Sequence, residues 1–243
     1  MAAPAFRAAG TLAHGTTDQT PAAPAGLATD DIELLLCESQ AGTHALTTAN
    51  GFVSAAADID VASGTATIAT HGSLWWRRYS GQADPVVTVA TNHILAQRYA
   101  FSGCATSGDP WDFIEPSSEA TEDTTGDATG NTTTSADCLI AVCLGSAKPD
   151  SVGTAEISAP TNANLTSVTE RADNAGNSGN GGHVGLITGV LATPGATGNT
   201  TYTKVSAGYK FHYVVALKPP SAVTANPLAV RVAGQAVKRA STW

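Results

Sequence analysis

The segment Tyr209–Lys218 constrains the fold more than any other part of the chain. Its sequence, YKFHYVVALK, alternates large apolar residues such as Phe211 with residues such as His212. Successive side chains of a strand point to opposite faces of its sheet, so a period of two predicts a half-buried antiparallel strand. Two prolines, Pro219 and Pro220, then end the strand.

Other short apolar stretches are also predicted to be strands. They are Ile32–Cys37, Ala66–Thr70, Leu74–Tyr79, Val86–Thr91, Ile94–Phe101, Cys138–Leu144 and His183–Leu191. Polar, turn-forming residues fill Ser117–Ala136 and Asp173–Gly182, which are predicted to be exposed loops. No segment repeats apolar residues at helical spacing over three turns. The pattern predicts an all-β protein, an antiparallel β-sandwich of jelly-roll-like type, and leaves the strand order open.

The prolines at 219 and 220 divide the chain into a β-sandwich domain, residues 1–219, and a short C-terminal extension, residues 220–243. Within the extension, Leu228–Val237 resembles one more strand, and Lys238, Arg239 and Trp243 close the chain. Two interpretations stay open: an arm that docks on a neighbouring protein, or a last edge strand packed on its own domain.

Composition and charge exclude several classes of protein. Of 243 residues, 42% are hydrophobic, enough for a sizeable core, while 13% are charged and the net charge is −8. An acidic surface repels phosphate backbones, so we expect no nucleic-acid partner. No apolar run approaches the roughly 20 residues that span a bilayer, so we expect no membrane partner. Met1–Gly10 lacks the pattern of a secretory signal, which predicts synthesis in a cytoplasm and retention there until lysis.

The four cysteines are predicted to be buried, unreactive thiols. Cys138 and Cys143 lie five positions apart in one apolar run, so a strand would point them to opposite faces. Cys37 and Cys104 stand alone, and no C-x-x-C pair occurs. A disulfide formed after release from the cell, and metal binding, remain as alternatives.

Motifs for catalysis are weak, and we predict no enzyme, no catalytic residue, no metal ligand and no cofactor. No G-x-S-x-G elbow occurs. Paired carboxylates could act on a sugar bond, but the acidic residues cluster in a stretch that resembles a solvated loop. The candidates are Asp84, Asp109, Asp112, Glu115, Glu119, Glu122, Asp123 and Asp127. A weak calcium site in that cluster is the alternative, although the register of a calcium loop is absent.

Glycines and aromatic residues each allow one more alternative. Gly176–Gly182 is glycine-rich, but a predicted strand follows it where a phosphate loop needs a helix, so we predict a plain loop. The aromatic residues Trp75, Trp76, Tyr79 and Trp111 could stack on sugar rings. Adjacent Trp75 and Trp76 must point to opposite faces of a strand, so core or subunit packing is the simpler prediction.

Several motifs, taken in order, resemble those of a family of phage-encoded virion structural proteins. They are PAGLATDDIELLLCES, LWWRRYSGQADPVV, HILAQRYAFSGCATSGDPWD, LTSVTERADNAGNSGNGG and the strand end VVALKP, and they span about residues 1–219. The most specific are W-R-R-x-x-G at Trp76–Gly81 and SGDPWD at Ser107–Asp112. The resemblance implies one β-sandwich domain encoded among virion genes, and it implies no catalytic residues.

We therefore expect a non-enzymatic structural component on the exterior of a tailed-phage virion. An external capsid decoration, or cement, protein fits best; it would bind the major capsid protein or other virion proteins and assemble as a homo-oligomer. The alternative is a tail or fibre protein that binds host surface carbohydrate. A third alternative is a lectin-like hydrolase, whose activity would be lost on neutralising Asp112 or Glu115.

Overall fold

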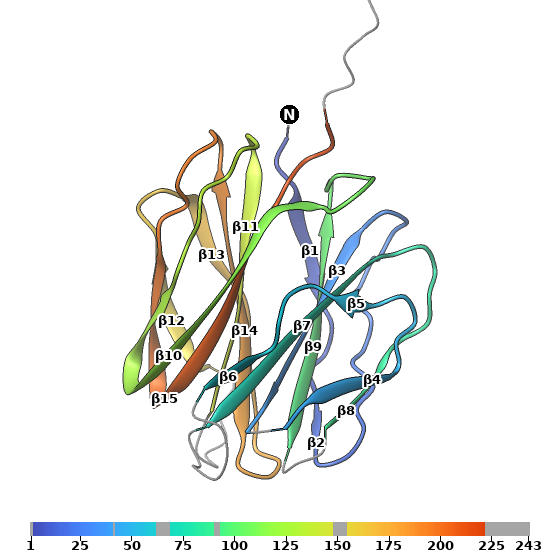
Figure 1. The fold of residues 1–243 in the computed structure, drawn as a ribbon, viewed down its shortest axis with the longest axis vertical. Coiled ribbons are helices and arrows are strands. Elements are labelled where there is room, and N and C mark those ends of the chain that lie inside the picture. The colour runs from blue at the N-terminus through green and yellow to red at the C-terminus, as the bar shows by residue number, and fades with distance from the viewer. Residues whose placement is uncertain (1, 41, 62–68, 90–92, 148–154, 222–243) are drawn as a thin grey trace, which may run out of the picture.

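The computed structural model describes residues 2–40, 42–61, 69–89, 93–147 and 155–221. Within these ranges the chain forms fifteen β-strands and no helix. The strands make two antiparallel sheets packed against each other and one smaller, two-stranded sheet (Figure 1). The predicted all-β antiparallel sandwich is confirmed.

The first sheet comes from the N-terminal part of the chain. Its central strands, in spatial order, are β9 (Ile94–Ser102), β3 (Ile32–Ser39) and β7 (Thr70–Arg78). On the β9 side lie β1 (Ala5–Ala9) and β2 (Ala13–Gly15); on the β7 side lie β5 (Val53–Ser54) and β6 (Ile59–Val61). A separate pair, β4 (His44–Thr48) and β8 (Val86–Val89), covers the outer face of this sheet.

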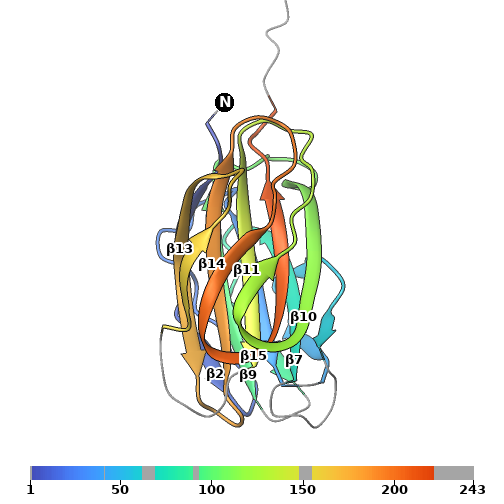
Figure 2. The same cartoon turned by 90° about the vertical axis from the view of Figure 1, so that its left-hand side faces the viewer.

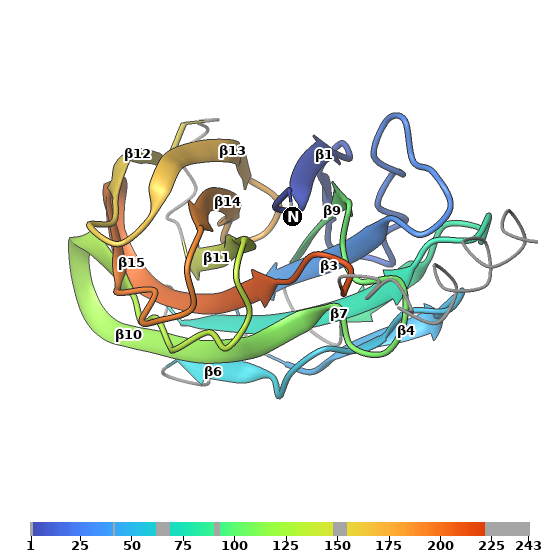
Figure 3. The ribbon, with the colours of Figure 1, turned by 90° about the horizontal axis from the view of Figure 1, so that it is seen from above.

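The second sheet comes from the C-terminal part. Its order is β10 (Trp111–Ala128), β15 (Thr200–Leu217), β11 (Cys138–Ala147), β14 (Gly182–Leu191) and β13 (Thr166–Gly176), with β12 (Ile157–Thr161) paired to β15. Strands β10 and β15 are each 18 residues long and bend in mid-course (Figure 2). The bend carries β12 and the first half of β15 over the outer face of β11 and β14, so the sheet rolls up (Figure 3).

Three apolar clusters fill the spaces between these layers. The main core lies between the two sheets and includes Leu36 and Leu186. A second fills the rolled part of the second sheet, around Ile140. A third lies beneath β4 and β8, around Leu35 and Val87. Adjacent residues of β3 thus belong to different cores, as the pleat of a strand requires.

The prediction that Tyr209–Lys218 is a strand is confirmed, but the prediction that it is half-buried is wrong. Phe211 and Tyr213 face the main core, as the alternation predicts. Lys210 and His212, on the other face, are also fully buried, at 0% exposure each. The reason is that β15 is an interior strand and the rolled sheet covers its second face.

The two predicted loops are largely strands. Ser117–Ala128 belongs to β10, because its polar side chains alternate and find partners on β15: Glu119 lies opposite Lys210. Half of Asp173–Gly182 is likewise wrong as a loop, since β13 runs to Gly176 and β14 begins at Gly182. Only residues 177–181 connect the two.

The sequence prediction left the strand order open. In the structure, the strands of one large sheet all come from the N-terminal part of the chain and those of the other from the C-terminal part. The sandwich extends from Ala5 to Leu217. Residues 222–243, nearly all of the predicted C-terminal extension at 220–243, lie outside the described residues, as does most of the predicted strand Ala66–Thr70.

Candidate functional site

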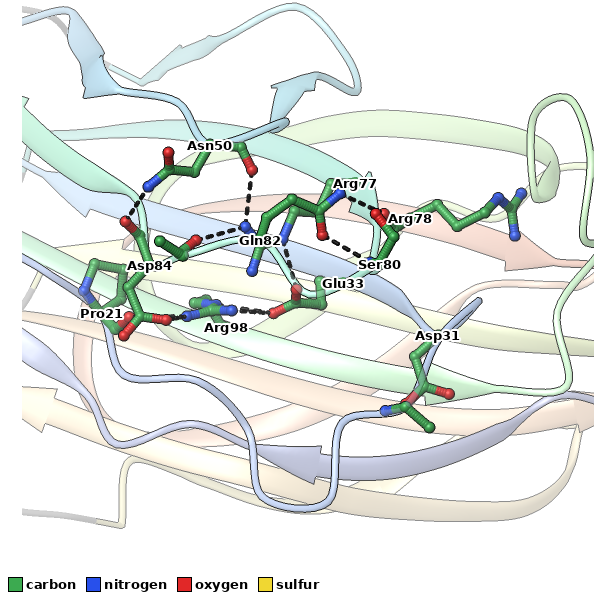
Figure 4. Close-up of polar contacts among 12 residues, drawn as sticks. Pro21, Asp31, Glu33, Asn50, Arg77, Arg78, Ser80, Gln82, Asp84 and Arg98 are labelled. Carbon is green, nitrogen blue, oxygen red and sulfur yellow. Dashed lines mark hydrogen bonds and ion pairs between the residues drawn. The ribbon is translucent and has the colours of Figure 1, made fainter.

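A buried ionic network crosses the three central strands of the first sheet. Glu33 of β3 lies between Arg77 of β7 and Arg98 of β9, and all three are at most 2% exposed. Arg77 Nε donates to Glu33 Oε2 at 2.6 Å, and Arg98 Nε donates to Glu33 Oε1 at 2.9 Å (Figure 4). One carboxylate thus bridges two guanidinium groups through charge-assisted bonds.

The same arginines fasten loops to the sheet. Arg77 Nη1 donates to the backbone oxygens of Asn50 and Ala83, both at 2.8 Å. Arg98 Nη1 pairs with Asp84, and the ring of Phe52 lies 4.4 Å from the Arg77 guanidinium carbon. A guanidinium group is planar and has five N–H donors, so one arginine can bind a carboxylate and backbone oxygens at the same time. The network is therefore a structural cross-link.

The two most specific sequence motifs meet at the edge of the main core. Trp76 of the first motif packs edge-to-face on Trp111 of the second, with ring centroids 4.7 Å apart. Arg78 Nη2 donates to the Gly108 backbone oxygen at 3.3 Å. Because Trp76 lies in the first sheet and Trp111 in the second, these motifs join the two sheets.

One Ser–His–acid arrangement occurs in the rolled sheet. Ser117 Oγ lies 3.5 Å from His212 Nδ1, while His212 Nε2 lies 2.8 Å from the Tyr202 hydroxyl and 3.5 Å from Glu119 Oε1. Burial, together with the charges of Lys210 and Lys204, lowers the pKa of His212 to about 3. A general base works best with a pKa near the operating pH, so His212 is poorly suited to activate Ser117.

A second Ser–His pair lies beneath β4. His44 Nδ1 lies 2.8 Å from Ser73 Oγ, and Ser73 is fully buried. Burial, together with the neighbouring His71, lowers the pKa of His44 to about 3. A substrate carbonyl has no route to a hydroxyl at this depth, so this pair too is built for packing.

Most of the acidic candidates bind protein groups, and only Glu119, Asp123 and Asp127 lie close together. Asp112 accepts backbone hydrogen bonds from Thr134 at 2.6 Å and Ser135 at 2.7 Å. Burial alone would raise the pKa of Asp112, but these bonds lower it. The others divide as follows: Glu115 accepts from Asn131, Asp84 pairs with Arg98, Glu119 and Asp123 face Lys210, and Asp109, Glu122 and Asp127 are exposed.

No set of three or more His, Cys, Asp or Glu side chains within the described ranges is arranged to hold a metal ion. All four cysteines are buried free thiols, as predicted. Cys138 lies in the rolled core and Cys143 in the main core, so the prediction of opposite faces is confirmed. Burial raises the pKa of Cys104 to about 12 and that of Cys138 to about 11, which keeps both unreactive.

The adjacent tryptophans point to opposite faces, as predicted. Trp76 packs on the main core and Trp75 on the cluster beneath β4 and β8. Both are half-buried, and each has an aromatic neighbour packed edge-to-face: Trp111 for Trp76 and His44 for Trp75.

An open groove of about 470 Å³ lies on the outer surface of β10, β12 and β15. Its lining is rich in hydroxyl groups and has one free-standing carboxylate, Asp127. The lining residues are Thr125, Gly126, Asp127, Ala159, Thr161, Thr201, Tyr202 and Thr203. Tyr202 is only 3% exposed, so the groove lacks a stacking ring.

Sequence reasoning did not find the ionic network or the histidines around β7. A signal for the network exists: Glu33 and Arg98 each interrupt a strand of otherwise buried type. A charge in such a run needs a buried partner. The histidines His44 and His71 carry no comparable signal, because they are far apart in the sequence.

Comparisons with known proteins found no match: no family model, curated protein or solved structure resembles the chain significantly. No helix in the part of the chain that the structure describes could cross a membrane.

Proposed function

We propose that the chain is a non-enzymatic structural protein on the exterior of a tailed-phage virion, and specifically a capsid decoration protein. The observation that carries this proposal is that buried charged and aromatic side chains connect the strands and sheets to one another. The Glu33–Arg77–Arg98 network joins three strands and the loops beside them, and the Trp76–Trp111 contact joins the two sheets. A protein that must keep its shape on a shell needs such cohesion between its sheets.

The location on a virion comes from the motif resemblance, with which the fold agrees. Both W-R-R-x-x-G and SGDPWD form internal contacts, so a relative that keeps them would keep the sandwich. The proposed partners are the major capsid protein or other virion proteins, together with further copies of the chain. Residues 220–243 would serve as the docking arm.

The edges of the sandwich are compatible with controlled assembly. Bulges interrupt β1, β10, β12 and β13, and acidic side chains line β10. Such features discourage uncontrolled strand pairing. The chain would therefore assemble through defined side-chain interfaces and not through its strand edges, as closed symmetric oligomers do.

Quantifying the protein in purified particles, against the major capsid protein, tests the proposal, together with imaging of its location. A decoration role predicts many copies spread regularly over the head. Absence from the particle would contradict it, and a few copies at the tail would favour the second candidate.

The second candidate is a tail or fibre protein that binds host carbohydrate, and the hydroxyl-lined groove favours it. Thr161 Oγ1 and Thr201 Oγ1 lie 2.9 Å apart there, close to Asp127. Carboxylates and hydroxyls can exchange hydrogen bonds with sugar hydroxyls. A glycan array distinguishes this candidate: binding should weaken in Asp127→Asn but not in Asp109→Asn, an exposed carboxylate outside the groove.

A further inference from the structure

One side of the main core is closed by a short segment, residues 53–61, which we name the strap. It comprises β5, β6 and the connection between them, and it pairs with β7 through only five residues. Ala55, Ala56, Ile59 and Val61 pack from the strap onto the main core. Few backbone pairs therefore hold a segment that covers apolar side chains.

Two aspartates of the strap contact one histidine of β7, and one of them, Asp58, also hydrogen-bonds the Ser73 side chain. His71 of β7 lies with Nδ1 2.5 Å from Asp60 Oδ1 and with Nε2 3.5 Å from Asp58 Oδ2. Both aspartates belong to the strap, and His71 is only 4% exposed. A protonated His71 would donate toward both carboxylates, whereas a neutral imidazole carries one N–H and no charge.

Two backbone contacts complete the attachment. The Tyr213 hydroxyl lies 3.1 Å from the Ala57 backbone oxygen and shares its one hydrogen with the Gly72 oxygen at 2.8 Å, and Ala55 N–H donates to the Leu74 oxygen at 2.9 Å. Neither depends on a proton that titrates near neutrality, since burial raises the pKa of Tyr213 far above its usual range. The His71 contacts are therefore the part of the attachment that can respond to pH.

Other ionisable groups around His71 do not replace its charge. From β4, the ring of His44 lies 4.8 Å away, and burial keeps His44 neutral. From β3, Glu38 is engaged with Thr70 at 2.8 Å and with His93, of the β8–β9 connection, at 3.1 Å. From the same strand, Cys37 is buried, which raises the pKa of its thiol.

We propose that the strap is held closed by protonated His71 bound between Asp58 and Asp60, and that loss of this proton loosens the strap from the side of the core. When His71 is neutral, the carboxylates of Asp58 and Asp60 repel each other, because no other cation among the described residues lies between them. The strap would then open as pH rises, exposing the apolar side chains beneath it. This response is a property of the folded chain, wherever the chain sits.

The direction of the pH effect follows from the two kinds of group. Burial alone would lower the pKa of His71, but the hydrogen bonds and charges of Asp58 and Asp60 raise it above the ordinary 6.5. Burial would raise the pKa of Asp58, but His71 and Ser73 lower it below 3.8. The attachment is thus complete in mildly acidic solution and is lost as pH rises through the pKa of folded His71.

Hydrogen exchange of the strap amides in the full chain, corrected for the intrinsic effect of pH, tests the proposal between pH 5.5 and 9. Protection of residues 53–61 should fall several-fold across a midpoint above 6.5, while protection of β11 stays constant. His71→Gln should abolish the transition. The matched control is His14→Gln, because His14 is exposed and contacts Ser178 on another part of the surface.

A second pair of measurements covers the case in which His71→Gln does not fold. Asp58→Asn and Asp60→Asn alter exposed carboxylates, 37% and 58% accessible, and should each lower the midpoint. The ring signals of His71 in an NMR titration should move with the same midpoint. Strap protection that is constant over the range, or a midpoint unmoved by either aspartate variant, would overturn the proposal.

Discussion

At the scale of single residues, this chain stabilises charges where its sheets are most deeply buried. Glu33 is fully buried between Arg77 and Arg98, so solvent could not take the place of either arginine if it were removed. A buried ion pair adds little net stability as a whole, but removing one member leaves an uncompensated charge. The network therefore acts chiefly to fix strand positions and loop attachment.

The variant Glu33→Gln should lower the free energy of unfolding by about 3–5 kcal/mol, because two buried guanidinium groups lose their carboxylate. Urea unfolding measures the change. Glu122→Gln is the control: Glu122 is exposed on β10, so its effect should stay within about 0.5 kcal/mol. Equal, small effects in both variants would show that the network is not formed.

Gly72 occupies a position where a larger residue does not fit. A methyl group there would overlap the ring of Phe211, as would a methyl group at Gly145. Gly72→Ala should cost at least about 1–3 kcal/mol in unfolding free energy through overpacking. The double variant Gly72→Ala with Phe211→Leu should recover part of that loss. A single variant as stable as the natural chain would contradict the described contact between the sheets.

Buried neutral histidines predict sensitivity to acid. The pKa values of His44 and His212 are both lowered to about 3, mainly by burial. Unfolded histidines titrate near 6.5, so below that pH the unfolded state binds more protons, and stability falls as pH falls. His71 acts in the opposite direction, but only above 6.5.

The urea midpoint should therefore be lower at pH 5 than at pH 7. His212→Asn should reduce this difference between the two pH values, whatever its effect on stability at pH 7. His14→Gln should leave the difference unchanged. A midpoint that is equal or higher at pH 5 would refute the prediction.

At the scale of elements, the strands that sequence reasoning found are those rich in large apolar residues, either in near-continuous runs or in alternation. Strands β3, β9, β11 and β14 are covered on both faces, and their sequences are correspondingly apolar. The missed strands, among them β10 and β13, are polar edge or roll strands. Their side chains pair with charges such as Lys210, a long-range contact that no local pattern contains.

The candidate site follows the same division. The face of each tryptophan and of Cys138 and Cys143 could be predicted, since alternation along a strand is local. The Glu33 network could not, because its partners come from β3, β7 and β9, and their pairing depends on the strand order. The alternation along one strand predicts which face of the sheet a side chain lies on, whereas its partners on other strands depend on the strand order.

The reassignment of Ser117–Ala128 from loop to strand can be tested directly. Amides of β10 that pair with β15, such as those around Ser117 and Ser118, should exchange hydrogen slowly in the native state. The connection at residues 177–181 is the internal comparison and should exchange fast. Similar, fast exchange in both segments would restore the loop interpretation.

At the scale of the whole molecule, the last strand and the last core residue within the described part of the chain end at Leu217. A docking arm at residues 222–243 would add nothing to the stability of the sandwich, so truncation after Ser221 should leave the free energy of unfolding unchanged within about 0.5 kcal/mol. The removed residues carry three cations and no acid, whereas the rest of the chain carries twenty acids and nine cations. If they form the docking arm, truncation should weaken binding to particles while the fold persists.

Adding the purified chain back to particles that lack it tests the central claim most directly. The account predicts saturable binding over the head surface, weaker binding by the chain truncated after Ser221, and DNA release at a higher temperature once the chain is bound. Failure of the full-length chain to bind such particles, or binding that leaves the temperature of DNA release unchanged, would contradict a decoration role.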